Sequence, residues 1–181
     1  MGSRNIAAKT AAVIGIGTAF MFLLMRFAAI PTGIPDTNIN LGIAVLAAFA
    51  AIFGPAAGFF IGFFGHTLTD LSLGGVWWSW VISSALFGLS IGSFRNFFKI
   101  TEGGFGITQA FYFNGIQILT NALTWVFIAR ALDLLIYQEP FEKVTIQGFV
   151  AAGVNAAVVL IVGTLLIIGY IKIKAAAAKK K

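Results

Sequence analysis

Apolar residues fill this chain in six long runs, and most charged residues lie near its ends or in the stretches between the runs. Most of the runs approach the ~20 residues that a helix needs to cross the hydrocarbon core of a bilayer. The second and third runs are shorter and are separated only by Gly54-Pro55, which predicts a helical hairpin that barely reaches one membrane face. The six predicted transmembrane helices cover residues 6–30, 39–53, 56–73, 77–98, 106–132 and 144–173.

The composition supports a membrane protein. Of the 181 residues, 59% are apolar and 10% are charged, whereas a soluble domain of this length needs a charged surface. The length leaves no room for a separate soluble domain, so we expect a single all-α domain over residues 1–181, a six-transmembrane-helix bundle. Because the chain has no cysteine, it has no disulfide and no thiolate metal site. Although the net charge is +6, no segment combines aromatic and basic residues as a nucleic-acid surface does, and we expect no nucleic-acid partner.

The distribution of basic residues predicts the orientation of the bundle. Cytoplasmic loops and ends of membrane proteins carry an excess of lysine and arginine. With the N-terminus in the cytoplasm, Arg130 and Lys143 lie outside and Arg26 lies near the outer end of the first helix. We therefore expect both termini to be cytoplasmic, with the C-terminal lysines near anionic lipid of the bilayer. The basic residues then inside are Arg4, Lys9, Arg95, Lys99, Lys172, Lys174, Lys179, Lys180 and Lys181.

Small residues form two rows along the start of the first predicted helix, Ala7-Ala11-Gly15 and Ala8-Ala12. Residues four apart lie on one face of a helix. Because lipid gives no hydrophobic drive for helix association, a bare face that permits close approach is typical of a docking surface. Packing within the chain's own bundle is the alternative interpretation. The third predicted helix has a similar row, which we expect to pack inside the bundle: Gly54, Gly58, Gly62 and Gly65.

Polar side chains recur at helical spacing inside the predicted helices. In the fifth, Gln117, Asn121 and Trp125 follow one face, and in the sixth, Gln147 and Asn155 share a face. Since polar groups inside a membrane need partners, these side chains either join helices or converge on an outward-facing pocket. Aromatic walls with a few hydrogen-bonding groups suit a small flat heteroaromatic ligand. The predicted substrate-binding residues are Asn38, His66, Asp70, Trp77, Trp80, Gln117, Asn121, Trp125, Gln147 and Asn155.

His66 and Asp70 lie one turn apart near the outer end of the third predicted helix. A metal site needs more ligands, and the chain has no second histidine, so we expect neither a metal ion nor a catalytic residue here. The pair either pins the helix or places Asp70 at the pocket mouth as an acceptor for a ligand. Trp77 and Trp78 have a second interpretation as an interfacial aromatic belt. The loop at residues 31–38, with two prolines and a glycine, is a candidate lid.

Three stretches carry a resemblance to a known family: TNINLGIAVLAAFAAIFGPAAGFFIGFFGHTLTD, WWSWVISSALFGLSIGSF and FNGIQILTNAL. They resemble the substrate-binding S components of energy-coupling factor (ECF) vitamin transporters, and within these the UPF0397 group, over about residues 6–173. The resemblance implies a six-helix protein of a prokaryotic cell membrane that binds a vitamin in an outward-facing pocket. It also implies a coupling transmembrane subunit and two cytoplasmic ATPases as partners. In the family an alanine-rich face of the first helix contacts the coupling subunit, and the rows at Ala7 and Ala8 match that pattern.

The resemblance places ATP and magnesium in the partner ATPases, and we expect no cofactor and no enzymatic activity in this chain, which lacks a P-loop. The favoured substrate is a hydroxymethylpyrimidine or a pyridoxine-like ring, with riboflavin as the alternative. Asn121, Gln147 and Asn155 suit the edge of such a ring, and a tryptophan suits its face. A stand-alone proton-coupled carrier with His66 and Asp70 as the relay is the second hypothesis. An intramembrane enzyme is disfavoured because no nucleophile, base and orienting group occur together.

Overall fold

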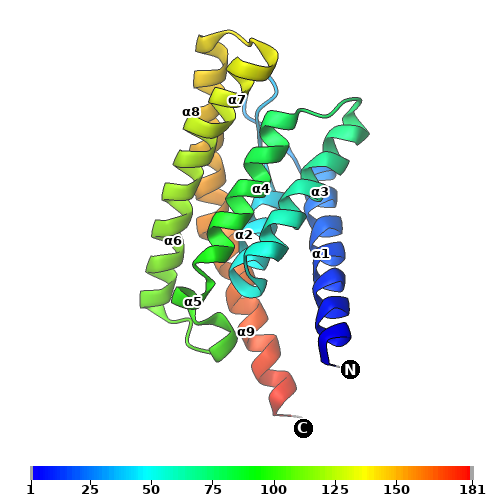
Figure 1. Ribbon diagram of the computed structural model, residues 1–181. Helices are drawn as coiled ribbons and strands as arrows, with labels where there is room; N and C mark the ends of the chain where they lie inside the picture. The colour runs from blue at the N-terminus through cyan, green and yellow to red at the C-terminus, as the bar shows by residue number, and fades with distance from the viewer. Residues whose placement is uncertain (1, 180–181) are drawn as a thin grey trace.

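Each of the six apolar runs is helical in the computed structural model, which describes residues 2–179 and, of their side chains, those of residues 7–179 (Figure 1). Lys180, Lys181 and the side chain of Arg4, which entered the predicted charge distribution, lie outside this description. The first half of the chain contains α1 (Gly2–Phe27), α2 (Leu41–Phe53), α3 (Pro55–Leu73), α4 (Trp78–Ser93), α5 (Arg95–Phe98) and the 3₁₀-helix η1 (Ile100–Glu102). The second half contains α6 (Ile107–Asn121), α7 (Arg130–Leu132), α8 (Phe141–Val158) and α9 (Thr164–Ala178).

Three π-helical segments join the helices of the second half into two long rods. They are η2 (Ala122–Ala129), η3 (Asp133–Tyr137) and η4 (Val159–Gly163). A short antiparallel hairpin, β1 (Ile30–Pro31) with β2 (Asn38–Ile39), lies between α1 and α2 and pairs Ile30 with Ile39. The predicted fold class, an all-α bundle of apolar helices, is confirmed for the described residues, with this hairpin as a small addition.

Three continuous helices are long and apolar enough to cross a bilayer: Ala7–Phe27, Ile107–Tyr137 and Phe141–Ala178. α4 with α5 and η1 is a fourth candidate, although its two parts meet at a bend of 54°. The 13 residues of α2 rise only about 20 Å, less than the ~30 Å of the hydrocarbon core. By length and composition the described residues therefore support three or four crossings, and the six-span count stays a prediction.

The turn between α2 and α3 follows from two adjacent residues. Gly54 has a φ of 98°, a conformation that strains any residue with a Cβ. Pro55 opens α3, where its missing N–H has no helical partner to lose. The two helices fold back as the predicted hairpin, and in Figure 1 their turn stops short of the level reached by the start of α1.

Glycines bring α3 close to α4 and α1. A Cβ at Gly58 would collide with the carbonyl oxygen of Gly88, and one at Gly88 would collide with that of Gly58. A Cβ at Gly65 would come within 2.7 Å of the Met21 sulfur on α1. These contacts confirm that the glycine row of the third predicted helix packs inside the bundle.

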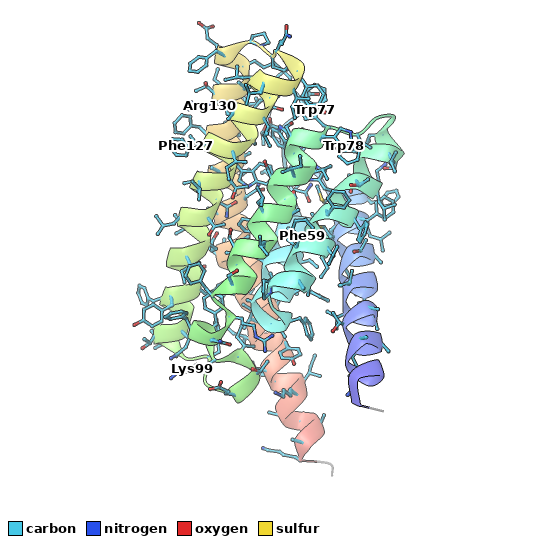
Figure 2. The ribbon with its side chains drawn as sticks, viewed as in Figure 1. Phe59, Trp77, Trp78, Lys99, Phe127 and Arg130 are labelled. Atoms are coloured by element: carbon cyan, nitrogen blue, oxygen red, sulfur yellow. The ribbon has the colours of Figure 1, made fainter. Side chains whose placement is uncertain are left out.

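The bundle has two distinct ends. Both described chain ends lie at the end of the bundle that also holds α5 in Figure 1, and the β-hairpin, the α3–α4 turn and the turn before α8 lie at the other. Figure 2 likewise places Trp77 and Trp78 at the end opposite Lys99. The termini thus lie on the same side, and their cytoplasmic location stays a prediction.

Candidate functional site

A cavity of about 480 Å³ lies at the end of the bundle opposite the chain ends. A smaller cavity of about 120 Å³ shares Asn38, His66, Asp70 and Trp80 with it and extends the site to Trp125 and Asn155. The volume of the larger cavity falls within the roughly 300–1,000 Å³ typical of small-molecule sites. Its walls come from the β-hairpin loop, α3, the start of α4, η3 and the start of α8.

Eight of the ten predicted substrate-binding residues line these two cavities, although they come from five separate segments of the chain. Trp125 and Asn155 are found only at the smaller cavity. The residues at the larger one are Asn38, His66, Asp70, Trp77, Trp80 and Gln147.

Gln117 and Asn121 form a hydrogen-bonded ladder behind the cavity rather than part of its lining. Both are fully buried. Gln117 Nε2 donates to the Ala156 carbonyl on α8 at 3.1 Å, and Asn121 Nδ2 donates to Gln117 Oε1 at 2.9 Å. Asn121 Oδ1 in turn accepts the Trp125 indole N–H at 3.0 Å. The ladder therefore joins α6 to α8 and fixes the orientation of Trp125. The Trp125 side chain, in turn, lines the smaller cavity.

His66 and Asp70 both face the cavity, and each has a partner within the protein. His66 is buried, and its Nδ1 lies 2.6 Å from the Ser84 hydroxyl on α4. Its Nε2 is 3.6 Å from Asp70 Oδ1, beyond hydrogen-bonding distance. Asp70 Oδ2 accepts the backbone N–H of Trp77 at 2.9 Å and so ties the end of α3 to the start of α4. The hydrogen bond between His66 and Asp70 that would pin the helix is therefore not formed. Asp70 instead pins the α3–α4 turn through Trp77 and also lines the cavity, and its contact with a ligand stays a prediction.

Asp133 holds the tryptophan wall of the cavity. This carboxylate, only 2% exposed, accepts the Trp77 indole N–H at 2.7 Å, the Trp80 indole N–H at 3.0 Å and the Ser79 hydroxyl. The Trp80 ring packs against Trp125 with a centroid distance of 5.2 Å. Because one carboxylate fixes two indole rings, the wall is set before any ligand arrives.

Trp77 and Trp78 differ in their surroundings. Trp77 lines the cavity, and its ring stacks on Tyr137 at a centroid distance of 4.0 Å. Trp78 packs against Phe63, is 44% exposed and does not line either cavity. The aromatic-belt interpretation therefore suits Trp78 better than Trp77.

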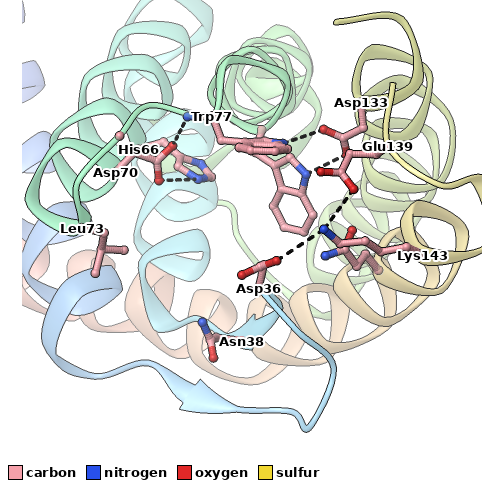
Figure 3. A pocket seen from close by; sticks show the side chains of 12 residues that line it. Asp36, Asn38, His66, Asp70, Leu73, Trp77, Asp133, Glu139 and Lys143 are labelled. Carbon is pink, nitrogen blue, oxygen red and sulfur yellow. Dashed lines mark hydrogen bonds and ion pairs between the residues drawn. The ribbon is translucent and has the colours of Figure 1, made fainter. Parts of the chain in front are cut away.

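A charged group closes one side of the mouth. Lys143 Nζ lies 3.0 Å from Glu139 Oε2 and 3.7 Å from Asp36 Oδ2. The neighbouring Gln147 donates through Nε2 to the Pro35 carbonyl at 2.9 Å. Two contacts therefore join α8 to the loop that the sequence identified as a candidate lid. Figure 3 shows Asp36 and Asn38 along this side and Asp70 with His66 across from Lys143.

The prediction omitted four charged residues of the cavity, Asp36, Asp133, Glu139 and Lys143. Asp36 lies in the hairpin loop, Glu139 lies just before α8 and Lys143 lies at its start, where no helical spacing points to them, and Asp133 lies within the helical rod that ends at Tyr137. The sequence did contain one signal for Asp133, which is an acid between Leu132 and Leu134 in an otherwise apolar stretch. Among the described residues, no group of three or more His, Cys, Asp and Glu is arranged to hold a metal ion.

The predicted docking residues lie together on the outer face of α1. Gly15 has open space where a Cβ would lie. A shallow, mostly apolar groove of about 560 Å³ runs between α1 and α3 and is lined by Ala11, Gly15, Phe60 and Phe64, among others. The residues of this exposed face are Ala7, Ala8, Ala11, Ala12 and Gly15.

Comparisons with known proteins point to one family. The sequence profile described as "ECF-type riboflavin transporter, S component" matches residues 5–172. A UPF0397 protein of Lacticaseibacillus casei is 45% identical over 168 residues, 92% of this chain and 90% of that protein. A UPF0397 protein of Clostridium perfringens is 46% identical over 173 residues, 95% of this chain and 94% of that protein. No solved structure matches the chain.

Proposed function

Because the chain belongs to the family of ECF-type riboflavin transporter S components, we propose that its cavity captures a vitamin or vitamin precursor on the outer side of the membrane. The chain is a substrate-binding subunit of the multi-pass membrane type and is not an enzyme. The proposed substrate is a hydroxymethylpyrimidine or a pyridoxine-like ring, and riboflavin is the alternative that the family description suggests.

The observation that carries the proposal is the construction of the cavity. Two indole rings fixed by Asp133 provide flat apolar walls, and Asp70, His66 and Gln147 provide polar groups at the edge. A flat heteroaromatic ring uses both, since its faces stack and its edge forms hydrogen bonds. Trp125 and Asn155 extend the same kind of lining to the smaller cavity.

The proposed mechanism assigns binding to this chain and energy to its partners. S components of this family act with a coupling membrane subunit and ATPases, and we propose two cytoplasmic ATPases here, with ATP and magnesium bound there. The alanine face of α1 is the proposed contact with the coupling subunit, because it is exposed and free of bulky side chains. On the evidence of the basic residues, we place the cavity end outside and both termini in the cytoplasm. The six apolar runs favour a six-span arrangement.

Two experiments test the proposal. Extraction from native membranes followed by mass spectrometry should identify a co-purified small heteroaromatic molecule. The purified chain in liposomes should bind that molecule without accumulating it when a pH gradient is applied. Accumulation driven by the gradient would favour the alternative, a proton-coupled carrier that uses His66 and Asp70.

A further inference from the structure

The ionisable groups around the larger cavity are strongly unequal in sign. Its lining contains four carboxylates, Asp36, Asp70, Asp133 and Glu139, and one lysine. With His66 neutral, this leaves an excess of three negative charges. A cavity with low-dielectric walls concentrates such a field on whatever enters it.

The lysine is already engaged by carboxylates. Lys143 contacts Glu139 at 3.0 Å and Asp36 at 3.7 Å, so its charge is shared between two acids. Two further bases toward this end, Arg26 and Arg130, lie over phenylalanine rings and do not line the cavity. In Figure 2, Arg130 lies beside Phe127 on the outer side of the bundle. Among the described residues, the only cation in the lining is therefore already paired with carboxylates, and an anionic ligand finds no free one.

A cationic ligand, in contrast, finds two kinds of partner. Asp70 Oδ1 has His66 Nε2 only at 3.6 Å, so it retains the capacity to accept a short hydrogen bond from a charged donor. The indole faces of Trp77 and Trp80 attract positive charge through their ring quadrupoles. Asp36 contributes less, because its side chain is 76% exposed, whereas that of Asp70 is 13% exposed.

We infer that the cavity selects a flat ring bearing a protonated amino group and rejects the phosphorylated forms of the same ring. The inference rests on the proposed function and narrows its substrate class by charge. The ring stacks on the tryptophan wall, and its amino group approaches Asp70. A phosphate ester in the same position would face an uncompensated negative field.

The test is a binding series in which only the charge of one substituent changes. The ring is 4-amino-2-methylpyrimidine, with a 5-aminomethyl group (cation), a 5-hydroxymethyl group (neutral) or its phosphate ester (anion). Pyridoxamine, pyridoxine and pyridoxine phosphate form a second series, and riboflavin with its 5′-phosphate forms a third pair. Titration calorimetry of the purified chain in detergent should show the cation binding about tenfold more tightly than the neutral ring. The phosphate ester should bind at least about a hundredfold more weakly than the neutral ring.

The outcomes separate the inference from the proposed function. If the phosphate ester of a ring binds as tightly as the neutral form, or more tightly, the inference is overturned and the S-component assignment stays intact. Equal affinities of cation and neutral ring also overturn it. If no ring of any series binds, the vitamin-binding function fails, and the inference fails with it.

Variants locate the source of the preference. Asp70→Asn should weaken binding of the aminomethyl ring about tenfold and of the hydroxymethyl ring less than about twofold. Glu142→Gln is the matched control, because Glu142 is exposed at the same end and does not line the cavity. Lys143→Gln should preserve the preference for the cation. A rise in affinity for the phosphate ester that occurs in Asp70→Asn and in neither other variant supports the inference. A loss of ester binding in Lys143→Gln would instead show that Lys143 forms an anion site and would overturn it.

Discussion

At the scale of single residues, Asp70 makes one structural contact and has one proposed role in ligand binding, and one substitution can separate them. Its Oδ2 accepts the Trp77 backbone N–H and holds the α3–α4 turn, and its Oδ1 lies 3.6 Å from His66 Nε2 in a residue that lines the cavity. An asparagine retains a carbonyl oxygen for the Trp77 N–H and loses the charge, whereas an alanine loses both.

We therefore expect Asp70→Asn to melt within about 2 °C of the wild type without ligand and to show a smaller ligand-induced rise. Asp70→Ala should melt about 2–4 °C lower without ligand, because the Trp77 N–H loses its acceptor at a cost of about 1 kcal/mol. A melting series with and without the co-purified small molecule measures both effects. An equal ligand-induced rise in wild type and Asp70→Asn would remove Asp70 from the binding site.

Asn121 acts on the site through Trp125. Asn121→Ala leaves the buried indole N–H of Trp125 and the Gln117 amide oxygen without their partner, which should cost about 1–3 kcal/mol of stability and weaken ligand binding. Trp125→Phe keeps a ring and removes the donor. If Asn121 serves mainly to orient Trp125, the double variant should lose less affinity than the sum of the single ones, as a double-mutant cycle would measure. Additive losses would instead place Asn121 in direct contact with the ligand. Leu119→Ala, on the exposed face of the same helix, is the control.

The residues of the site were predictable where helical spacing carried the information. The His66–Asp70 and Gln147–Asn155 spacings place each pair on one face, and the structure turns those faces to the cavities. The spacing of residues along a helix does not reveal which other element packs against that face of the helix. Gln117 and Asn121 share their face with Trp125, yet α8 packs beside them, and their side chains bond to the Ala156 carbonyl and to the Trp125 indole instead of lining a cavity. Asp133 was missed because its partners, Trp77, Ser79 and Trp80, lie more than 50 positions away in sequence.

At the scale of elements, the close crossing of α3 and α4 supports one wall of the cavity. A Cβ at Gly62 would lie 2.7 Å from the Ser84 carbonyl carbon, and the Ser84 side chain contacts His66. Since backbone rather than a flexible side chain is the obstacle, the two helices must separate to accept an alanine.

Gly62→Ala should therefore destabilise the protein by about 1–3 kcal/mol and loosen the cavity. Gly153→Ala on α8 is the matched control, because a Cβ there meets nothing within 4 Å and an alanine favours the helix. Thermal unfolding in detergent should show a lower midpoint for Gly62→Ala and an unchanged or higher one for Gly153→Ala. Equal midpoints for the two variants would contradict the assigned role of the crossing.

The elements themselves follow closely from the apolar runs, because each run is bounded by glycine, proline or charge and is helical in the structure. The departures have tertiary causes. The helix of the fourth run is interrupted at Phe94. The next residue, Arg95, donates through Nη1 to the Phe53 carbonyl at 3.2 Å, 42 positions earlier in sequence. The β-hairpin is held by Gln147, 112 positions from Pro35. Neither contact leaves a local signal in the sequence.

At the scale of the whole molecule, two surfaces are separate. The cavity occupies the end of the bundle opposite the chain ends, whereas the small residues of α1 begin near the N-terminal end and run along its side. A change on one surface should therefore leave the other intact. This separation matches a subunit that binds its substrate at one place and its partner at another.

The final prediction uses this separation. Replacing Ala7 and Ala11, or Ala8 and Ala12, with leucine adds bulk to an exposed face, so the chain should fold and bind its small molecule with unchanged affinity. Close approach of a partner helix should be blocked, so co-purification with the coupling subunit and ATP-driven uptake should both fall. Ala157→Leu is the control, because Ala157 is also exposed on a helix but lies on α8, away from the alanine rows. Affinity measured in detergent and uptake measured with co-expressed partners give the two readouts. Normal assembly and uptake in both double variants would show that the partner docks elsewhere, whereas loss of binding alone would show that this face supports the cavity.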